Sequence, residues 1–530
     1  MGEHTRRTVL YGAAAAGALV VGGGAVAASA SAAPGARRGA GTGVRPAGSA
    51  GRGRRPFLEG AYAPVTEEVT AYDLPVVGRI PRELDGRYLR NGPNVLGLED
   101  PLAHHWMQGE GMVHGVRLRG GRAEWYRNRW VRARSVAQKL GEPYPWPEPA
   151  ADFAANTHVI GFQGKVLALQ ESGPLPYELD EELRTVGPYD FGGSLRGAFT
   201  AHTKYDAWAD ELHAVAYDVT WGFVRHLVVD REGRVARSTD VPVADSPMMH
   251  DFALTERHVV LFDVPVTFDA EAAARGESVP YTWNRRHPTR IGVLPREGGK
   301  VRWFPVEPFY FSHTLNAYDD GDRIVVDVTS MPAPFYAAGR GSGGPAAAGP
   351  PTLHRWTIDL RQGRAVERQL DDRPQEFPRL REDLVTRPHR YAYTAFAADM
   401  WRAYGGLGDT PPDHAFTNTL IKQDLLRGTS EVHRFPRGAA VSEPVFVPRE
   451  PAPGAGPRPG ATGHGRGHGL GHGRREDDGY VLAYVHDPDR GATDLVILAA
   501  QDFTAAPLAR VQLPVRVPLG FHGSWVADPA

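Results

Sequence analysis

The chain has 530 residues, with 60 Lys and Arg against 62 Asp and Glu, and therefore a formal net charge of -2. This near-neutral balance lacks the basic surplus that binding to nucleic acid or to an anionic membrane surface requires, so the composition argues against both partners. The chain contains no cysteine, which excludes disulfides, thiolate metal ligands, iron–sulfur clusters and a cysteine nucleophile. Any protein-held metal must therefore rest on His, Asp or Glu side chains.

The first 33 residues have the layout of a cleavable export signal. A twin arginine, Arg6-Arg7, precedes an apolar Ala/Gly/Val run that ends in small residues near Ala28. A membrane anchor is the alternative, but the run is short and only moderately hydrophobic for a bilayer span. We therefore expect residues 1–33 to be a twin-arginine export signal, and the mature protein to be extracellular or associated with the cell envelope.

Two further segments have the composition of flexible chain. Residues 34–56 are rich in Gly, Pro and Arg and contain almost no bulky apolar side chains, which is typical of a disordered linker. Residues 451–476 are rich in Gly, Pro and His, and three of their histidines are spaced by glycines. A metal-binding tract is one interpretation, but without a rigid frame we favour a flexible insert. The remainder, residues 57–530, is expected to be a single domain.

From about residue 60 onward, short β-rich runs alternate with turn signals. Examples of such runs are KVLALQ (165–170), FVRHLVVD (223–230) and GYVLAYVHD (479–487), and examples of turns are REGR (231–234) and DDGD (319–322). Runs of this length, rich in Val, Ile, Leu and aromatic residues, predict β-strands, and the short turns between them predict antiparallel pairing. The sequence therefore predicts an all-β domain.

Helical periodicity is scarce. Two segments, 177–186 and 416–426, could each be a short helix or irregular. A doubly wound α/β fold would need a helix after nearly every strand, so the pattern argues against it. A large all-β domain must either stack its sheets or close them into a ring, and a β-propeller is the closed arrangement that extends to several hundred residues.

Four histidines stand where a turn-like segment meets a β-rich run: His202 in FTAHTKYD, His250 in SPMMHDFA, His313 in FSHTLNAY and His522 in PLGFHGSW. Their successive separations, 48, 63 and 209 residues, fit one, one and three repeats of about 60 residues, as expected for ligands from different blades of a ring. Other sets of the 21 histidines fit such a repeat too, so spacing alone does not select this set. Four neutral imidazoles would suit Fe(II), Zn(II) or Cu(II).

Each metal-ligating histidine needs an acceptor for its second ring N–H, and carboxylates commonly supply it. Three glutamates lie in or beside apolar, strand-like runs, where an unpaired carboxylate would be costly. They are Glu171 in LALQESG, Glu376 in QEFPRL and Glu443 in SEPVFVP. The alternative is that each is an ordinary glutamate of an edge strand.

A series of motifs, in order along the chain, resembles the carotenoid cleavage oxygenases. The series includes LDGRYLRNGPN (84–94), GAFTAHTKYD (197–206), MHDFALTERHVV (249–260), SHTLNAYDDGD (312–322) and SEPVFVPR (442–449). It continues through GFHGSW near the C-terminus, so the resemblance runs from about residue 57 to the end of the chain. The chain is identified on these motifs as a member of that family.

The resemblance implies a seven-bladed β-propeller with a dome of loops and helices over a metal on the propeller axis. It implies one Fe(2+) per subunit, held by four histidines of which three have a carboxylate partner. The implied ligands are His202, His250, His313 and His522, and the implied partners of the last three are Glu171, Glu376 and Glu443 respectively. No further catalytic side chain is implied, because the metal and dioxygen carry the chemistry.

The implied activity is the oxidative cleavage of a C=C bond of a carotenoid or apocarotenoid with O2, which gives two carbonyl products. Members that cleave stilbenes often carry a Lys directly before the first glutamate, where this chain has Gln170, so we favour the carotenoid class. A stilbene dioxygenase and a propeller that binds or isomerises a carotenoid without cleaving it are the alternatives. Collection of an apolar substrate could also require transient contact with a membrane, and no protein partner is indicated.

Overall fold

The computed structural model describes residues 57–98, 101, 104, 106–147, 154–173, 175–275, 279–333, 349–397, 418–449 and 475–528. Strands dominate these residues, and the α-helices among them are two short ones, α1 (Arg134–Leu140) and α2 (Ala270–Ala274). The expected export signal, the expected linker and almost all of the expected insert lie outside the described residues. The domain boundaries therefore stay predictions.

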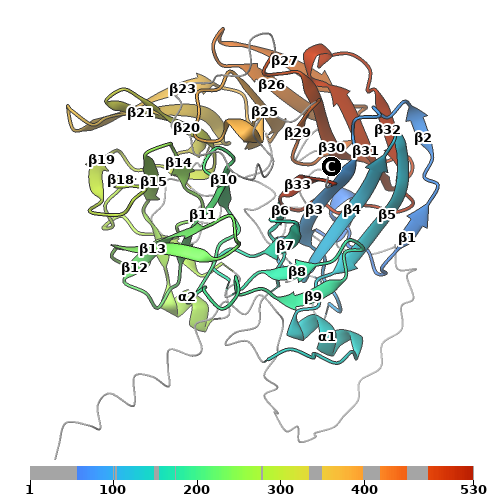
Figure 1. The fold of residues 1–530 in the computed structure, drawn as a ribbon, viewed down its shortest axis with the longest axis horizontal. Helices are drawn as coiled ribbons and strands as arrows, with labels where there is room; N and C mark the ends of the chain where they lie inside the picture. The colour runs from blue at the N-terminus through green and yellow to red at the C-terminus, as the bar shows by residue number, and fades with distance from the viewer. Residues whose placement is uncertain are drawn as a thin grey trace, which may run out of the picture.

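Seven sheets of four to six strands form a ring, so the protein is a seven-bladed β-propeller (Figure 1). The fold class expected from the sequence is thus confirmed. Five of the blades are built from four strands each that come from one stretch of chain. In chain order these are β6 (His158–Phe162), β7 (Lys165–Leu169), β8 (Tyr177–Leu179) and β9 (Thr185–Pro188); β10 (Thr203–Asp206), β11 (Glu211–Tyr217), β12 (Phe223–Val229) and β13 (Val235–Pro242); β14 (Ala253–Leu254), β15 (His258–Asp263), β18 (Arg290–Pro295) and β19 (Arg302–Pro305); β20 (Tyr310–Asp320), β21 (Arg323–Met331), β22 (Thr352–Asp359) and β23 (Arg364–Asp371); β24 (Gln375–Arg379), β25 (Tyr391–Phe396), β26 (Thr419–Asp424) and β27 (Thr429–Arg434).

The other two blades combine strands from both ends of the described chain, and this closes the ring. One has the order β1 (Thr70–Tyr72), β5 (Arg122–Trp130), β4 (Gly111–Arg119), β3 (Gly86–Pro93) and β33 (Gly523–Ala527). The other has the order β2 (Val76–Gly78), β32 (Ala509–Gln512), β31 (Ala492–Ala499), β30 (Gly479–Asp487) and β28 (Ala440–Val441), and β29 (Val445–Pro448) also pairs with β30. Figure 1 shows the early strands β1 to β5 beside the late strands β30 to β32. Backbone pairing of β3 with β33 thus joins the two ends without a disulfide.

The core lies between the blades, and this explains the continuous apolar runs in the sequence. Strands such as β15 and β31 are buried along almost their whole length, because neighbouring blades cover both faces of each sheet. Phe262 of β15 and Phe311 of the next blade, for example, have ring centroids 4.4 Å apart. The outer strands β13 and β23 are largely exposed instead. Burial of each such aromatic side chain contributes roughly 1.5–3 kcal/mol.

The two segments expected to be helical or irregular are strands, so that expectation was wrong. Residues 177–186 contain β8 and the start of β9, joined by a turn in which Asp180 accepts backbone N–H groups at 2.8–3.0 Å. Leu183 has φ 64° in this turn, which interrupts a helix. The described part of 416–426 contains β26, which pairs on both edges, with β25 and β27. Sheet pairing therefore decides both segments over their local helical propensity.

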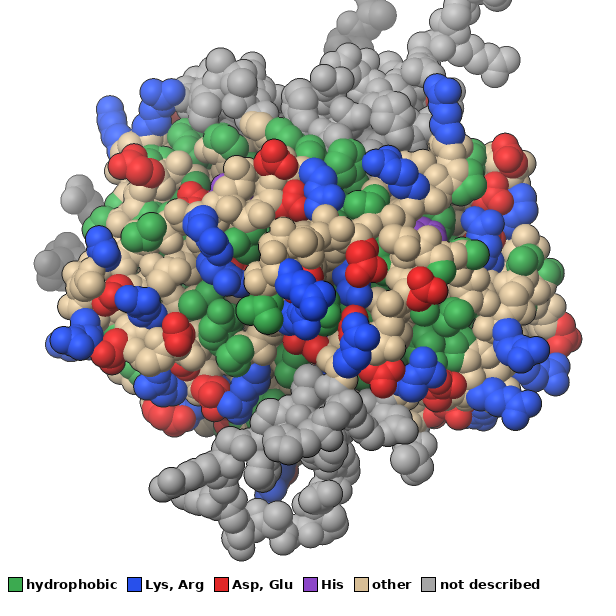
Figure 2. All heavy atoms as spheres, turned by 90° about the horizontal axis from the view of Figure 1, so that it is seen from above, with side chains coloured by type: hydrophobic (Ala, Val, Ile, Leu, Met, Phe, Trp, Pro, Cys, Tyr) green, Lys and Arg blue, Asp and Glu red, His purple; other side chains and the backbone are tan. Residues whose placement is uncertain are grey.

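The surface agrees with the near-neutral charge. Figure 2 shows one side of the ring, on which acidic and basic side chains are interspersed among small apolar areas. Among the described residues, no helix is both long and apolar enough to cross a bilayer.

Candidate metal centre

Four histidines meet at the centre of the ring because each stands at or near the start of a strand that faces it. His202 directly precedes β10, His250 lies three residues before β14, His313 lies in β20, and His522 directly precedes β33. These strands belong to four different blades. The inner strands of a propeller surround a common channel, so residues at the same level of different blades can approach one another.

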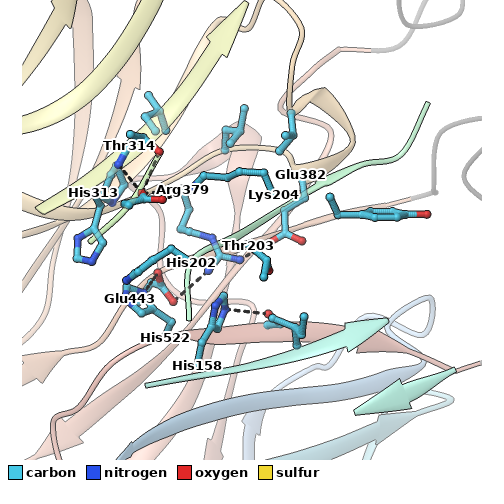
Figure 3. A pocket seen from close by; sticks show the side chains of 18 of the residues that line it. His158, His202, Thr203, Lys204, His313, Thr314, Arg379, Glu382, Glu443 and His522 are labelled. Atoms are coloured by element: carbon cyan, nitrogen blue, oxygen red, sulfur yellow. Dashed lines mark hydrogen bonds and ion pairs between the residues drawn. The ribbon is translucent and has the colours of Figure 1, made fainter. Parts of the chain in front are cut away.

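The four imidazole rings form a compact group. The ring centroid of His202 lies 4.4 Å from that of His250, 5.2 Å from that of His313 and 4.8 Å from that of His522. Nitrogen atoms of His202, His250 and His313 all lie within 4.8 Å of one another, a spacing at which one metal ion could be held. The His522 ring lies 4.7 Å from that of His313 and so borders the same space (Figure 3).

Three of the rings have a buried or half-buried carboxylate on Nδ1, in the pairing that the sequence analysis expects. The Nδ1 atom lies 2.8 Å from Glu171 in His250, 2.6 Å from Glu376 in His313 and 2.9 Å from Glu443 in His522. Among the described residues, no carboxylate contacts His202. An Nδ1–H that donates to a carboxylate fixes the tautomer and leaves the Nε2 lone pair free.

The free Nε2 atoms show that the group suits a cation. The His250 and His313 Nε2 atoms face each other at 3.4 Å, and the buried His202 Nε2 has no hydrogen-bond partner among the described residues. Burial, and then the neighbouring imidazoles, hold the pKa of His202 well below its ordinary value, so this ring is neutral. Converging lone pairs in a buried space are unfavourable unless a cation binds them. Neutral imidazoles are suitable donors for Fe(II), Zn(II) or Cu(II).

The backbone beside two of the carboxylates adopts a rare conformation. Phe377 follows Glu376 with φ 54°, and Ser172 follows Glu171 with φ 50°. The register of β24 is irregular at this point, and the Phe377 ring stacks on the His313 ring with centroids 5.6 Å apart. Non-glycine residues in this region of φ are costly and tend to occur at functional sites. Glu376 and Phe377, which are adjacent in the chain, thus both contact the ring of His313.

The Glu443 carboxylate is held by three groups. Its Oε2 accepts the Gly523 backbone N–H at 2.8 Å and lies 3.1 Å from Arg379 Nη1, while its Oε1 faces His522. Burial raises the pKa of Glu443, but Arg379 and His522 outweigh it, so the net pKa lies well below the ordinary range. The carboxylate is therefore ionised and fixes the ring of His522.

A cavity of about 320 Å³ reaches the histidines (Figure 3). Its walls include His202, His313 and His522. They also include Tyr205, which is 40% exposed, and Glu382, whose side chain is 52% exposed, so the cavity connects the histidines with the surface. The lining mixes apolar side chains with charged and polar ones. The expected dome lies partly outside the described residues.

One residue of this cavity, His158, is not among the candidates from the sequence. It is the first residue of β6, its ring centroid lies 5.3 Å from that of His522, and its Nδ1 lies 3.0 Å from the Ala201 carbonyl oxygen. Burial lowers the pKa of His158 to about 3, so the ring is neutral. Its position at the start of an inner strand, like that of His202, is the signal that could have identified it.

The fold and the histidine group define a β-propeller whose centre offers nitrogen donors for a divalent cation. Residues 62–527 match the family model described as retinal pigment epithelial membrane protein. The chain is 41% identical over 525 residues to the carotenoid cleavage oxygenase of Mycobacterium tuberculosis. This alignment covers 90% of the chain and 98% of the relative. It is 32% identical over 497 residues to the isoeugenol monooxygenase of Pseudomonas putida, and this alignment covers 89% of the chain and 98% of the relative.

A solved structure, that of Pseudomonas brassicacearum lignostilbene dioxygenase, is similar with a TM-score of 0.76 and 27% identity, covering 90% of this chain and 99% of that one. The cobalt-substituted apocarotenoid oxygenase of Synechocystis shares the fold, with a TM-score of 0.73 and 24% identity over 88% of this chain and 97% of that one. The protein therefore belongs to the retinal pigment epithelial membrane protein family, that is, to the carotenoid cleavage oxygenases. The expected family membership is thus confirmed, and the chain is an oxygenase.

Proposed function

We propose that the protein is a non-haem iron(II) dioxygenase that cleaves one C=C bond of a carotenoid or apocarotenoid. The observation that carries the proposal is the group of four imidazoles at the centre of the propeller, three of them fixed by carboxylates on Nδ1. The 41% identical relative is named a carotenoid cleavage oxygenase, which supports this substrate class. Each carbon of the double bond receives one oxygen atom of O2, and both the σ and the π bond between the two carbons break. The reaction thus gives two carbonyl products and needs no external reductant.

The residues have distinct tasks in this reaction. The Nε2 atoms of the four histidines would hold one Fe(2+), and the ion, when bound, supplies the activation of dioxygen. The three glutamates fix the tautomer and orientation of their rings and increase the basicity of the donor atoms. Burial keeps the site poor in water, which strengthens these contacts and limits side reactions. No side chain needs to transfer a proton.

Gln170 favours a carotenoid over a phenolic stilbene. Its Oε1 accepts the backbone N–H of Ala155 at 2.6 Å, so this neutral side chain is held against the backbone. It cannot provide the positive charge that a lysine at this position would offer to a phenolic oxygen. A stilbene or related phenolic alkene is the second candidate, because other relatives are named isoeugenol monooxygenase and lignostilbene dioxygenase.

The test uses iron-loaded protein and three substrate classes: carotenoids, apocarotenals and hydroxystilbenes. Each substrate is incubated first without oxygen and then in air, and the products are identified by mass. We expect paired carbonyl products from a carotenoid or an apocarotenal, formed only in air, with one O2 consumed per cleavage. Products from stilbenes alone would replace the proposed substrate class. An isomer as sole product, or no product despite bound iron, would refute cleavage.

We also propose that the protein is exported by the twin-arginine route, on the layout of residues 1–33. The test replaces Arg6 and Arg7 together by lysine, which keeps the charge and removes the twin-arginine feature. In a host with this export route, the original protein should appear outside the cytoplasm and the lysine variant should stay inside. Equal distribution of the two proteins would contradict the proposal.

A further inference from the structure

One carboxylate, that of Asp251, links the three chain segments that carry His202, His250 and His313. Asp251 directly follows His250 in the sequence. Its Oδ2 accepts the backbone N–H of Thr314 at 2.8 Å and the Thr314 hydroxyl at 2.9 Å, and Thr314 directly follows His313. The other oxygen, Oδ1, lies 2.8 Å from the ammonium group of Lys204, two residues after His202. These contacts join three neighbouring blades directly beside the histidines. Figure 3 shows the two partners of Asp251, Lys204 and Thr314, in the pocket that His202 and His313 also line.

The environment of Asp251 makes this link rigid. The side chain is 1% exposed and that of Lys204 is 18% exposed. The carboxylate forms an ion pair with Lys204 at 2.8 Å and accepts two hydrogen bonds from Thr314. The backbone N–H of Phe252 adds a fourth donor at 2.8 Å. A buried carboxylate with four donors has no free direction in which to move, because each displacement breaks a charge-assisted hydrogen bond.

We propose that Asp251 is a positioning residue that sets the spacing of the three Nε2 atoms of His202, His250 and His313. The inference rests on the proposed function, in which these atoms hold the metal. All four donors of Asp251 are protein groups, so the carboxylate acts on the geometry of the site and not as a ligand. His522 is positioned separately, through Glu443 and Arg379, and Arg379 also donates to the Gly523 carbonyl oxygen at 3.0 Å.

Small shifts matter here, because a metal site must be held within about 0.5 Å of its working geometry. Substitution of Asp251 by Asn removes the negative charge that Lys204 contacts. It also replaces one of the two carboxylate oxygens by an NH2 group, so a single oxygen remains to accept hydrogen bonds from Lys204 and Thr314. The segments that carry His202 and His313 then lose their common anchor. Metal affinity and ligand geometry should change, although the number of histidines stays the same.

The test compares Asp251→Asn with a matched control, Asp327→Asn. Asp327 is 0% exposed and forms an ion pair of 2.7 Å with Arg355, which is 18% exposed, so the two pairs are alike in burial. In the described part of the chain, the side-chain partners of Asp327 are Arg355 and His389, and neither belongs to the histidine group. The readouts are Fe(II) and Co(II) affinity by chelator competition, the visible spectrum of the Co(II) form, and the melting temperature of the metal-free protein.

We expect Asp251→Asn to lower metal affinity by about 10- to 100-fold and to change the Co(II) spectrum. The control should lower the melting temperature and leave affinity and spectrum unchanged. The double variant Lys204→Met/Asp251→Asn removes the unpaired ammonium group, so its melting temperature should recover while its affinity stays low. Thr314→Val keeps the backbone N–H and removes the hydroxyl, and it should cause a smaller loss of the same kind.

An affinity and a spectrum like those of the original protein in Asp251→Asn would overturn the proposal, as would equal losses in Asp327→Asn. If Asp251→Asn fails to fold, Thr314→Val decides, and an unchanged affinity and spectrum in that variant overturns the proposal. Failure of the proposed function gives a different result, because the original protein would then bind no metal at the histidines. Normal binding by the original protein with no effect of Asp251→Asn refutes the positioning role alone.

Discussion

Substitution of Glu376 separates the charge of this carboxylate from its hydrogen bonds. Glu376 is 0% exposed; its Oε2 lies 2.6 Å from His313 Nδ1 and also accepts the Phe377 backbone N–H, and its Oε1 accepts the Thr329 hydroxyl at 2.7 Å. In Glu376→Gln, an amide oxygen in the place of Oε2 keeps two of these bonds, and the amide NH₂ can donate to the Thr329 oxygen. Glu376→Ala removes all three.

The expected magnitudes follow from this geometry. The Gln variant loses only the charge, so metal affinity should fall about tenfold, which corresponds to about 1.4 kcal/mol. The Ala variant also frees the His313 ring, so affinity should fall by about 100-fold. A buried donor without a partner costs about 1–3 kcal/mol, so three such donors should lower the free energy of unfolding of the metal-free Ala variant by about 3–9 kcal/mol. In the Gln variant the change should stay within about 1 kcal/mol.

Metal affinity is measured by competition with a chelator, and the free energy of unfolding by urea denaturation of the metal-free proteins. Metal affinity should be highest in the original protein, lower in the Gln variant and lowest in the Ala variant. Equal affinity in all three would refute the reasoning, because the carboxylate would then have no influence on His313 as a ligand. A Gln variant as unstable as the Ala variant would show that the amide does not replace the carboxylate oxygens.

Three shorter predictions concern ligation, closure of the ring and pH. His313→Ala should lose both bound iron and turnover, and retention of either would contradict the ligand assignment. A Cβ on Gly523 would lie 2.4 Å from the Leu89 carbonyl oxygen, so Gly523→Ala should lower the melting temperature, whereas an unchanged value would contradict this contact. Burial lowers the pKa of His287, but Asp263 and Asp245 outweigh it and the net pKa is raised. The stabilisation by protonated His287 is therefore fully present below the pKa of the unfolded state and is lost as pH rises through the pKa of the folded state. In urea denaturation, the original protein should exceed His287→Gln in free energy of unfolding by less above neutral pH than below it. A difference that does not change with pH would contradict this prediction.

The strands were predictable because the blades cover one another. Runs such as HVVLFD and DLVILA are apolar along most of their length, and in the structure both lie in strands that are buried on both faces. The number of blades came from the resemblance to a family, because local patterns do not show which strands share a sheet. Pairing of β3 with β33, which joins residues more than 400 positions apart, has no local signal at all. The errors at 177–186 and 416–426 have a different origin, since pairing with neighbouring strands of the same blade decided both.

The histidines illustrate how far local reasoning extends at the site. The position of each at a turn-to-strand junction is visible in the sequence, and the structure brings all four together, although their role as ligands remains a prediction. Spacing could not select them, because the blades differ in length and the 209-residue gap before His522 spans several. His158 occupies the same kind of junction and was not selected. Asp251 was not identifiable either, since its partners Lys204 and Thr314 lie 47 and 63 residues away.

The architecture itself explains why the site needs so many supporting contacts. Each histidine comes from a separate blade, so no local hydrogen-bond ladder fixes one relative to another, and any sliding of a blade would move a donor atom. The three Glu–His pairs and the Asp251 contacts all run between blades and therefore resist such sliding. A metal bound by four blades would act in the same direction, because a ligand that binds only the folded state adds about 2.7 kcal/mol when present at 100 times its Kd. Metal binding, where it occurs, would then be coupled to closure of the ring, because the contacts that position the donors also hold the blades together.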